Sequence, residues 1–283
     1  SVILAVDTNN KLAQDTGLDI ENTLIVSLHP TSGEYRNLDY YRSIVSEDLQ
    51  QLSELSGVES VSLMNQLPIN QRGMLGNVYD LDDPEIVHRD KYLRDSKIFL
   101  TNENLSNTLA LALLEGRFLT KDDQLDFGSD QNGNVLITES LKKALYGDGS
   151  ALGQETNNGR IVGVVKDIML NPTIPVDKQY GVFANRVMEF IFIGRYYLLK
   201  VSPGQVEAVR NKVSDTILAV QAERDIYRIM TMAEHMKRFY SHDKGLAELF
   251  LLLCGLMIFV TAISSYAYSQ FHISRQKKYI GIR

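Results

Sequence analysis

The chain has 283 residues, of which 44% are hydrophobic and 23% charged, an ordinary globular composition with enough apolar residues for a sizeable core. The whole chain carries a formal charge of −6, and because the only charged residues after Glu248 are four cations, the residues up to Glu248 sum to −10. An acidic body argues against nucleic-acid binding, which needs cations to displace phosphate counterions, and against adhesion to anionic lipid. Cys254 is the single cysteine, which excludes an intrachain disulfide and leaves the redox compartment open.

The N-terminal segment begins with Ser-Val-Ile-Leu-Ala-Val, which is too short for the apolar part of a secretory signal and lacks a basic start. We expect Val2–Val6 to be the last outer turn of a membrane helix, because of the C-terminal sequence described below. The polar stretch Asp7–Gly17 then extends that helix outward as a stalk.

A strand–helix–strand pattern follows. Glu21–His29 alternates between apolar and polar residues as a strand does, and Pro30 closes it. Apolar residues then recur at helical spacing through Tyr35–Leu55, and Gly57 ends the predicted helix. Val58–Met64 is the second predicted strand.

A similar pattern lies nearer the other end of the chain. Tyr196–Val201 is a predicted strand, Val206–Ala222 places its valines and isoleucine on one helical face, and Asp225–Met232 is a second strand. The similarity is one of pattern and not of residue identity. Two such units around a different middle predict a pseudo-repeated α+β domain with an insertion.

The middle, about Pro68 to Ile193, reads as a smaller β-rich lobe. Its short predicted strands are separated by spacers rich in turn-forming residues. The strands are Asn134–Ile137, Arg160–Val165 and Phe190–Ile193, and Leu141–Leu145 is a short helix.

The C-terminal part has the features of a membrane span. Met232–Gly245 is helical in character and is expected to continue into Leu249–Ala267, a run of 19 residues without a charge. At about 1.5 Å per residue this run nearly spans a hydrocarbon core of about 30 Å. Aromatic residues follow where an interfacial belt would lie, and then the cations typical of a cytoplasmic flank. The alternative, a buried helix of a large soluble domain, explains the apolarity but not the length or the one-sided cations.

The cations set the expected orientation. Arg275, Lys277, Lys278 and Arg283 would lie in the cytoplasm, and everything before Glu248 outside the inner face of the membrane. The sequence is therefore interpreted as an extracytoplasmic domain between two spans. On this interpretation it is a fragment that lacks the first span and whatever follows the second.

No residue cluster predicts an active site. Ser241-His242-Asp243 has the residue types of a hydrolase triad, but triads are assembled by geometry and not by adjacency. The five histidines are scattered, and there is no phosphate-binding glycine loop. We therefore predict no catalytic residue and no bound nucleotide in this chain.

Two acidic segments are candidates for cation sites. Asp130-x-Asn132-x-Asn134 begins like a calcium loop, but valine and leucine stand where such a loop needs glycine and glutamate. Leu81–Glu85 is an acidic loop that would make at best a weak cation site. We predict no metal site and no cofactor in the chain.

Six blocks of sequence lie in order over nearly the whole chain: Gly17–Leu28, Tyr40–Ile69, Leu111–Asp123, Asn134–Gln154, Arg160–Ile168 and Arg275–Arg283. Together they resemble the extracytoplasmic core domain of MacB-type and FtsX-like ABC transporter permeases. The third block contains the family's "GR-F-x-x-x-D" pattern, and the last, "RQKKYIGIR", is similar to the run at the cytoplasmic end of the family's second membrane helix. Tyr279 stands where that run usually has an acidic residue, and the loop around Gly73 and Gly76 does not align with the family.

The resemblance implies an α+β fold of two lobes followed by a transmembrane helix. A porter-like lobe comes from the two strand–helix–strand units, and a β-rich lobe is inserted between them. The implied segments are a first-helix end and stalk at 1–17, porter-like halves at 18–68 and 194–232, the β-rich lobe at 69–193, a stalk helix at 233–248, a transmembrane helix at 249–271 and a cytoplasmic coupling segment at 272–283.

The resemblance also implies a function and partners. The chain would be a non-catalytic permease subunit in a bacterial inner membrane, dimerising with an identical or paralogous subunit, each with four membrane helices. ATP and Mg²⁺ would bind a fused or separate ABC ATPase. Some relatives work with a periplasmic adaptor and an outer-membrane exit duct. The expected cargo is peptides, lipoproteins or small amphipathic compounds.

Mechanical transmission is the expected mechanism. A helix from about Met232 to Tyr279 would measure on the order of 70 Å and would carry the motion of the ATPase across the bilayer without substrate crossing it. Arg275, Lys277, Lys278 and Arg283 are the candidate coupling residues. Two alternatives stay open: an FtsX-like regulator whose outer domain activates a cell-wall hydrolase, and a membrane-anchored sensor without an ATPase.

Overall fold

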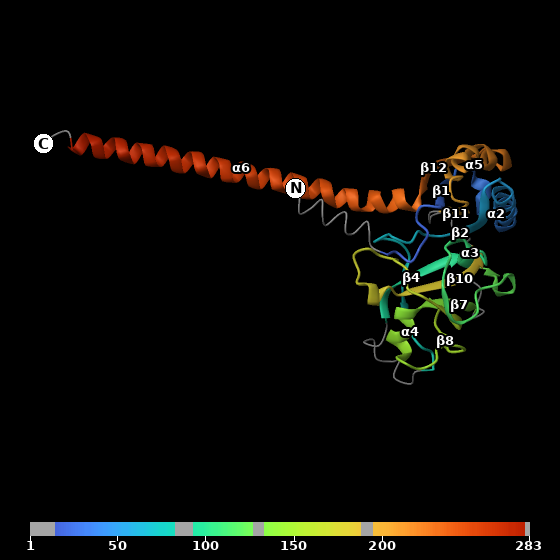
Figure 1. Cartoon of the computed structure of the whole chain (residues 1–283). Coiled ribbons are helices and arrows are strands. Elements are labelled where there is room, and N and C mark those ends of the chain that lie inside the picture. Colours follow the sequence, from blue (N-terminus) through green and yellow to red (C-terminus); the bar gives the residue numbers. More distant parts are fainter. Residues whose placement is uncertain (1–14, 83–92, 127–132, 188–194, 281–283) are drawn as a thin grey trace. The chain divides into compact units, whose positions relative to one another are not determined.

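The computed structural model describes residues 15–82, 93–126, 133–187 and 195–280 (Figure 1). Within these ranges the side chains of residues 241–250 and 270–280 lie outside the description. The chain divides into two compact units, of which one is Asp15–Met236 and the other contains the residues from Lys237 onward.

Four strands of the first unit form the porter-like sheet. The two strand–helix–strand units interleave, since the strand order is β12-β1-β11-β2. Each neighbouring pair in this order is antiparallel. This order is that of a split βαβ arrangement. It confirms the predicted α+β fold. The elements are β1 (Thr23–Pro30), α2 (Leu38–Ser53), β2 (Val58–Met64), β11 (Arg195–Val201), α5 (Val206–Val220) and β12 (Arg224–Thr231).

The first helix begins later than predicted. A short 3₁₀ helix, η1 (Gly33–Arg36), precedes α2, and Asn37 between them has an extended backbone. The Asn37 side-chain oxygen accepts hydrogen bonds from the backbone N–H groups of Asp39 and Tyr40 at 3.0 and 3.2 Å. The predicted helix over 35–55 is therefore wrong at its start, because asparagine at this position caps a new helix instead of continuing the old one.

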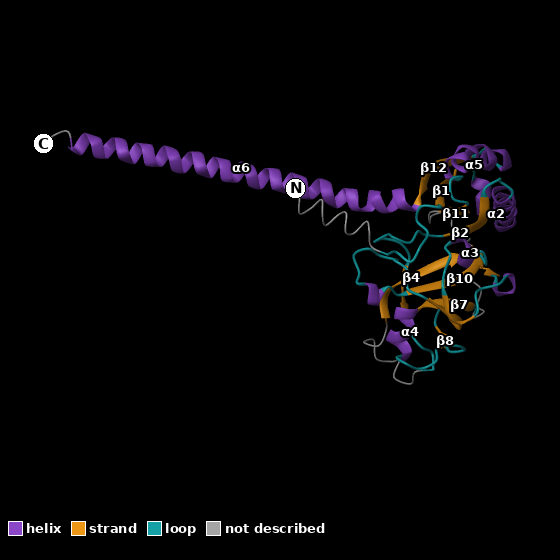
Figure 2. Ribbon diagram, in the orientation of Figure 1, coloured by secondary structure: helices purple, strands orange, loops and turns teal. Residues whose placement is uncertain are grey.

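Alternation along the strands places the core between sheet and helices. Leu24, Val26 and Leu28 of β1 belong to one buried cluster with Leu52 of α2 and Val213 of α5. The two helices also contact each other, and Figure 2 shows them beside these strands. Because apolar side chains at every second strand residue face apolar helix stripes, burial of this face stabilises the unit.

The β-rich part continues the same hydrogen-bonded sheet in the order β4-β10-β7-β9-β5, with parallel and antiparallel pairs mixed. The structure confirms the predicted strands at 134–137 and 160–165 and the predicted short helix. It also contains β4 and β10, which were not predicted. The predicted strand Phe190–Ile193 lies outside the described residues. The path strands are β4 (Leu93–Thr101), β5 (Leu113–Gly116), β7 (Asn134–Thr138), β9 (Gly159–Val165) and β10 (Gly181–Val187). Shorter elements are β3 (Leu75–Val78), α3 (Leu105–Thr108), η3 (Lys121–Asp123), β6 (Leu125–Asp126), α4 (Glu139–Tyr146), β8 (Glu155–Thr156) and η4 (Val176–Lys178).

The two halves of the sheet meet at β2 and β4, where the register has one residue pair, Met64 with Thr101. Beyond it the side chain of Asn65 takes over the pairing: its amide donates to the Ile98 carbonyl at 3.1 Å and its oxygen accepts from Leu100 N–H at 3.0 Å. Asn65 is buried. The side-chain amide thus supplies partners for a carbonyl and an N–H of β4 where the ladder with β2 would otherwise end.

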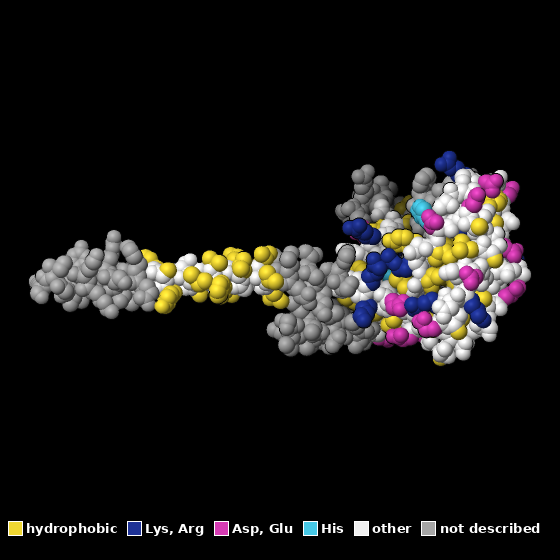
Figure 3. All heavy atoms as spheres, turned by 90° about the horizontal axis from the view of Figure 1, so that it is seen from above, with side chains coloured by type: hydrophobic (Ala, Val, Ile, Leu, Met, Phe, Trp, Pro, Cys, Tyr) yellow, Lys and Arg dark blue, Asp and Glu magenta, His cyan; other side chains and the backbone are white. Residues whose placement is uncertain are grey.

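The last helix, α6 (Met232–Ile280), has 49 residues. Its stretch Leu251–Ser269 is long and apolar enough to cross a membrane by length and composition, with a mean hydropathy of 1.9 over 19 residues and none of the stretch buried. Figure 3 shows its exposed hydrophobic side chains. This helix agrees with the predicted transmembrane helix.

Candidate functional site

The first unit contains a cleft of about 440 Å³ between α2 and the ends of β4 and β10. This volume lies in the range of about 300–1,000 Å³ that is usual for small-molecule sites. Five segments of the chain supply its walls. The lining residues are Arg42, Val45, Ser46, Leu49, Gln50, Ser53, Leu63, Thr101, Asn102, Glu103, Asn104, Lys121, Gln124, Asn185 and Arg186.

One wall is a single stripe of α2. Arg42, Val45, Leu49 and Ser53 recur every three or four residues and so lie on one helical face. Val45 and Leu49 make the wall partly apolar, and buried Leu63 of β2 adds to this apolar region.

The end of β4 is held against β2 by Asn102. Its side-chain oxygen accepts hydrogen bonds from the Ser62 hydroxyl at 2.8 Å and from Leu63 N–H at 3.3 Å. The Ser62 hydroxyl also lies 3.0 Å from that of Thr101. These contacts fix the segment Thr101–Asn104 as the rim of the cleft.

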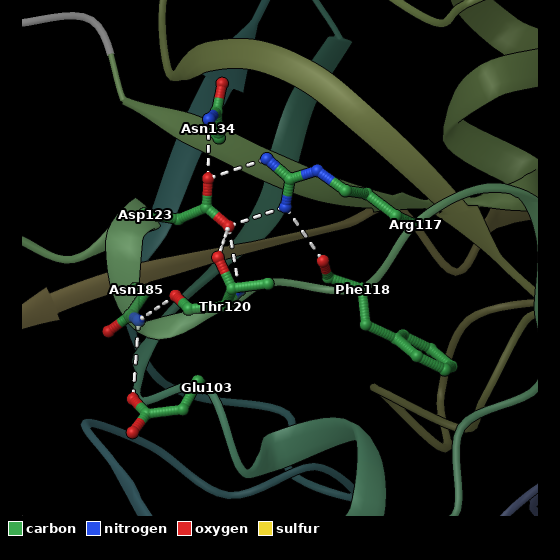
Figure 4. Close-up of polar contacts among 7 residues, drawn as sticks. All are labelled: Glu103, Arg117, Phe118, Thr120, Asp123, Asn134 and Asn185. Atoms are coloured by element: carbon green, nitrogen blue, oxygen red, sulfur yellow. Dashed lines mark hydrogen bonds and ion pairs between the residues drawn. The ribbon is translucent and has the colours of Figure 1, made fainter.

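The opposite wall rests on a carboxylate network around Asp123 (Figure 4). Arg117 donates from both terminal nitrogens to the two Asp123 oxygens at 2.6 and 2.8 Å, and Asn134 donates to the same carboxylate at 2.6 Å. The Thr120 N–H and hydroxyl add bonds of 2.7 and 2.9 Å. The Arg117 hydrogen bond is the main cause that holds the pKa of the Asp123 carboxyl well below its usual range, and burial opposes it.

The backbone at Gly116 explains why the "GR-F-x-x-x-D" pattern begins with glycine. Its backbone has φ +75°, and a Cβ built there would lie 2.2 Å from the Val162 carbonyl oxygen. The chain then turns so that Arg117 can donate to the Phe118 carbonyl at 2.9 Å as well as to Asp123. A side chain at 116 is excluded by both conformation and space.

Asn185 links this network to the cleft. Its amide donates to the Thr120 carbonyl at 2.9 Å and approaches the Glu103 carboxylate at 3.5 Å. Asn185 is buried at the C-terminal half of β10, so η3 and the end of β4 are tied to the same strand. The network therefore sets the shape of the cleft wall.

The cleft lining is cationic. The described residues that line it include three cations, Arg42, Lys121 and Arg186, and one carboxylate, Glu103. Arg42 also forms an ion pair with Asp39 at 3.7 Å, so Lys121 and Arg186 are the cations that a ligand would meet first. Burial lowers the pKa of the Arg186 guanidinium from its ordinary value. The lining has charged groups, amides and hydroxyls beside apolar side chains, which suits recognition of a ligand more than covalent chemistry.

A second buried network lies on the other side of α2. Arg224 forms an ion pair with Asp48, and the Tyr197 hydroxyl donates to the same carboxylate at 2.7 Å. Burial, followed by the Asp48 charge, raises the pKa of Tyr197. The Arg195 guanidinium lies 5.0 Å from the Tyr35 ring centre and 4.2 Å from that of Tyr41. This network holds α2, β11 and β12 together.

The residues singled out from sequence have different places. The backbone of Arg275, Lys277 and Lys278 is helical in α6, their side chains are not described, and Arg283 lies outside the described residues. Asn134 belongs to the Asp123 network. Asp130 and Asn132 lie outside the described residues, as does the Asp83–Glu85 part of the acidic loop. Among the described residues, no group of three or more His, Cys, Asp or Glu side chains could hold a metal ion.

Sequence reasoning missed the cleft. The block Leu111–Asp123 was the one signal in the sequence, because its Arg117 and its last residue, Asp123, form the ion pair that supports one wall. The block alone could not predict a cleft, because most of the other lining residues come from α2 and from the ends of β4 and β10, two strands that were not predicted.

Comparison with known proteins gives a family. The family described as the MacB-like periplasmic core domain matches residues 1–216. The periplasmic region of MacB from Actinobacillus actinomycetemcomitans is 20% identical, with 81% of this chain and 96% of that chain covered and a TM-score of 0.49. The extracellular domain of the noncanonic ABC-type transporter YknZ from Gram-positive bacteria is 15% identical, with 73% and 99% covered and a TM-score of 0.44. No curated protein matches the chain.

Proposed function

Because this chain belongs to the MacB-like periplasmic core domain family of ABC transporter permeases, we propose that it transmits the motion of a cytoplasmic ATPase to an extracytoplasmic domain. The proposed outcome is export or extraction of peptides, lipoproteins or small amphipathic compounds. The membrane is proposed to be a bacterial inner membrane.

The continuity of α6 is the observation that carries this proposal. One helix contains the buried Met232 and Met236, which belong to the first unit, and the exposed apolar stretch Leu251–Ser269. At about 1.5 Å per residue its length is about 70 Å, more than twice a hydrocarbon core of about 30 Å. A continuous helix passes a displacement along its axis with little loss, because every turn is hydrogen-bonded to the next.

An insertion experiment tests the coupling. Seven Gly-Ser residues inserted after Lys244 should uncouple the first unit from the ATPase, whereas seven alanines there should preserve the helix and nearly its phase. The full transporter, with its ATPase, is placed in nanodiscs and carries a spin label at Glu47→Cys in a Cys254→Ser background. The distance between labels of two permease subunits is then measured with and without ATP and vanadate.

We expect ATP to change that distance in the parent protein and in the alanine variant, but not in the Gly-Ser variant, while all three hydrolyse ATP. An unchanged response of the Gly-Ser variant would show that α6 does not transmit the motion. The experiment is independent of the transported substrate.

The proposed partners are tested separately. Affinity capture of the full-length protein from membranes should recover an ABC ATPase and a second permease subunit, and an adaptor where one exists. Replacement of Arg275, Lys277 and Lys278 by glutamine should weaken ATPase capture. Recovery of a cell-wall hydrolase would instead favour the FtsX-like regulator, and absence of any ATPase would favour a sensor.

A further inference from the structure

The cleft between α2 and the ends of β4 and β10 has a local charge opposite to that of the chain around it. Three cations and one carboxylate are among its described lining residues, whereas the residues up to Glu248 sum to −10, since the whole chain carries −6 and the four cations after Glu248 add +4. A concave surface with low-dielectric walls concentrates the field of the charges that line it. This cleft therefore favours an anion although the body is acidic.

Among the cations that line the cleft, Arg186 is the one that is partly buried without a partner among the described residues. It lies at the C-terminal end of β10, directly after Asn185, and is half-buried. Within the described parts of the chain its guanidinium has no hydrogen-bond or ion-pair partner, and burial lowers its pKa with no carboxylate to offset the effect. Partly desolvated cations are normally paired, and the planar fork of arginine fits a carboxylate or a phosphate with two parallel hydrogen bonds.

The rest of the lining adds a second requirement. Lys121 is exposed at the rim and, among the described residues, has no ion-pair partner either. Opposite these cations, Val45, Leu49 and Leu63 present an apolar wall, with the amides of Asn102 and Gln124 also lining the cleft. A ligand that matches this surface has an anionic head and an apolar body.

We propose that the cleft binds a small amphiphilic oxyanion, whose carboxylate or phosphate pairs with Arg186 and whose apolar part lies against Val45, Leu49 and Leu63. Lys121 contributes a second positive charge at the entrance, and Glu103 limits the affinity by repulsion. This site goes beyond the proposed transmission function and does not depend on it.

Ligand titration followed by methyl NMR tests the site on the full chain in nonionic detergent, with leucine and valine methyls labelled. The probes are phenyl phosphate and benzoate, which supply the two candidate heads on one apolar ring, and benzyl alcohol as the neutral control. We expect both anions to shift the methyls of Val45, Leu49 and Leu63 and to bind at least tenfold more tightly than benzyl alcohol. Binding of one anion alone assigns the head group.

Three variants separate a specific site from a general charge effect. Arg186→Gln should weaken anion binding at least tenfold, because it removes the charge and the paired donors. Arg36→Gln makes the same charge change at an exposed arginine outside the cleft and should leave the affinity within twofold. Glu103→Gln removes the opposing carboxylate and should tighten binding.

Two results would overturn the proposal. One is that neither anion shifts the cleft methyls more than benzyl alcohol does. The other is that Arg186→Gln and Arg36→Gln weaken binding equally, which would make the attraction a property of net charge. Because these readouts involve neither the ATPase nor α6, they can fail while the insertion experiment succeeds, and the reverse also holds.

Discussion

Asp48 of α2 and Arg224 of β12 form an ion pair that is shut off from solvent, with side-chain exposures of 1% and 2%. They lie 176 residues apart in sequence, on opposite sides of the inserted β-rich part. The Tyr197 hydroxyl donates to Asp48, and Arg224 also donates to the Ile217 carbonyl. The pair thus joins the first strand–helix–strand unit to the second.

Removing one partner of this pair should be costly. Asp48→Asn leaves Arg224 charged, buried and without its counter-ion, and should lower the free energy of unfolding by about 3–5 kcal/mol. Urea unfolding followed by circular dichroism measures the loss. The double variant Asp48→Leu with Arg224→Met should recover most of it, because no isolated charge stays buried. A single variant as stable as the double would argue that the two charges do not depend on each other.

The Asp123 network should give the domain an acid-sensitive component of stability. Hydrogen bonding to Arg117 is the main reason that the pKa of Asp123 lies below its usual value of about 3.9. A carboxyl whose pKa is lower in the folded state stabilises that state above its unfolded pKa, and this stabilisation is lost as the pH falls through the folded pKa. Between pH 5 and pH 2 the stability of the parent should therefore fall more steeply than that of Asp123→Asn. Parallel curves would exclude Asp123 as a source of the acid sensitivity.

The strand–helix–strand units could be predicted because apolar periodicity and burial coincide in them. Leu24, Val26 and Leu28 alternate along β1 and all are buried. In β10, by contrast, Asn185 has the character of a surface residue but is buried, since its partner is the carbonyl of Thr120, which is 65 residues away in sequence.

The start of β4 was missed for a related reason. It carries Asp95, Ser96 and Lys97, a polar run that argues against a buried strand, and Asp95 has a positive φ of 63°. Ser96 and Lys97 are nevertheless buried. Local periodicity in a sequence does not show which polar residues find hydrogen-bond acceptors far away in the chain, as Asn185 does. A cleft built from the ends of β4 and β10 could therefore not be predicted from the sequence pattern.

Gly116 should tolerate substitution less than a glycine of similar backbone conformation in open space. Gly116→Ala combines a left-handed backbone with a Cβ 2.2 Å from the Val162 carbonyl oxygen, whereas Gly153, at φ +83°, has nothing within 4 Å. Gly153→Ala should cost about 1–2 kcal/mol of unfolding free energy from conformation alone. Gly116→Ala should cost more and should also weaken the Arg117–Asp123 pair. Equal losses in thermal or urea unfolding would show that the clash relaxes at no cost.

Lys97 should make the domain more stable as the pH rises above neutrality. Its side chain is buried and donates to the carbonyls of Asn70 and Arg72 at 2.7 and 2.8 Å, with no carboxylate beside it among the described residues. Burial lowers the pKa of Lys97 to about 8, from 10.5.

A base whose folded pKa is the lower one binds its proton less tightly in the folded state. Between pH 8 and pH 10.5 the unfolded chain therefore holds more protons, and the free energy of unfolding rises with pH in that window. Urea unfolding at steps from about pH 7 to 9.5 should show this rise in the parent and not in Lys97→Met. The difference between the two curves isolates Lys97 from other titrating groups. A constant difference across that range would mean that Lys97 keeps an ordinary affinity for its proton despite its burial.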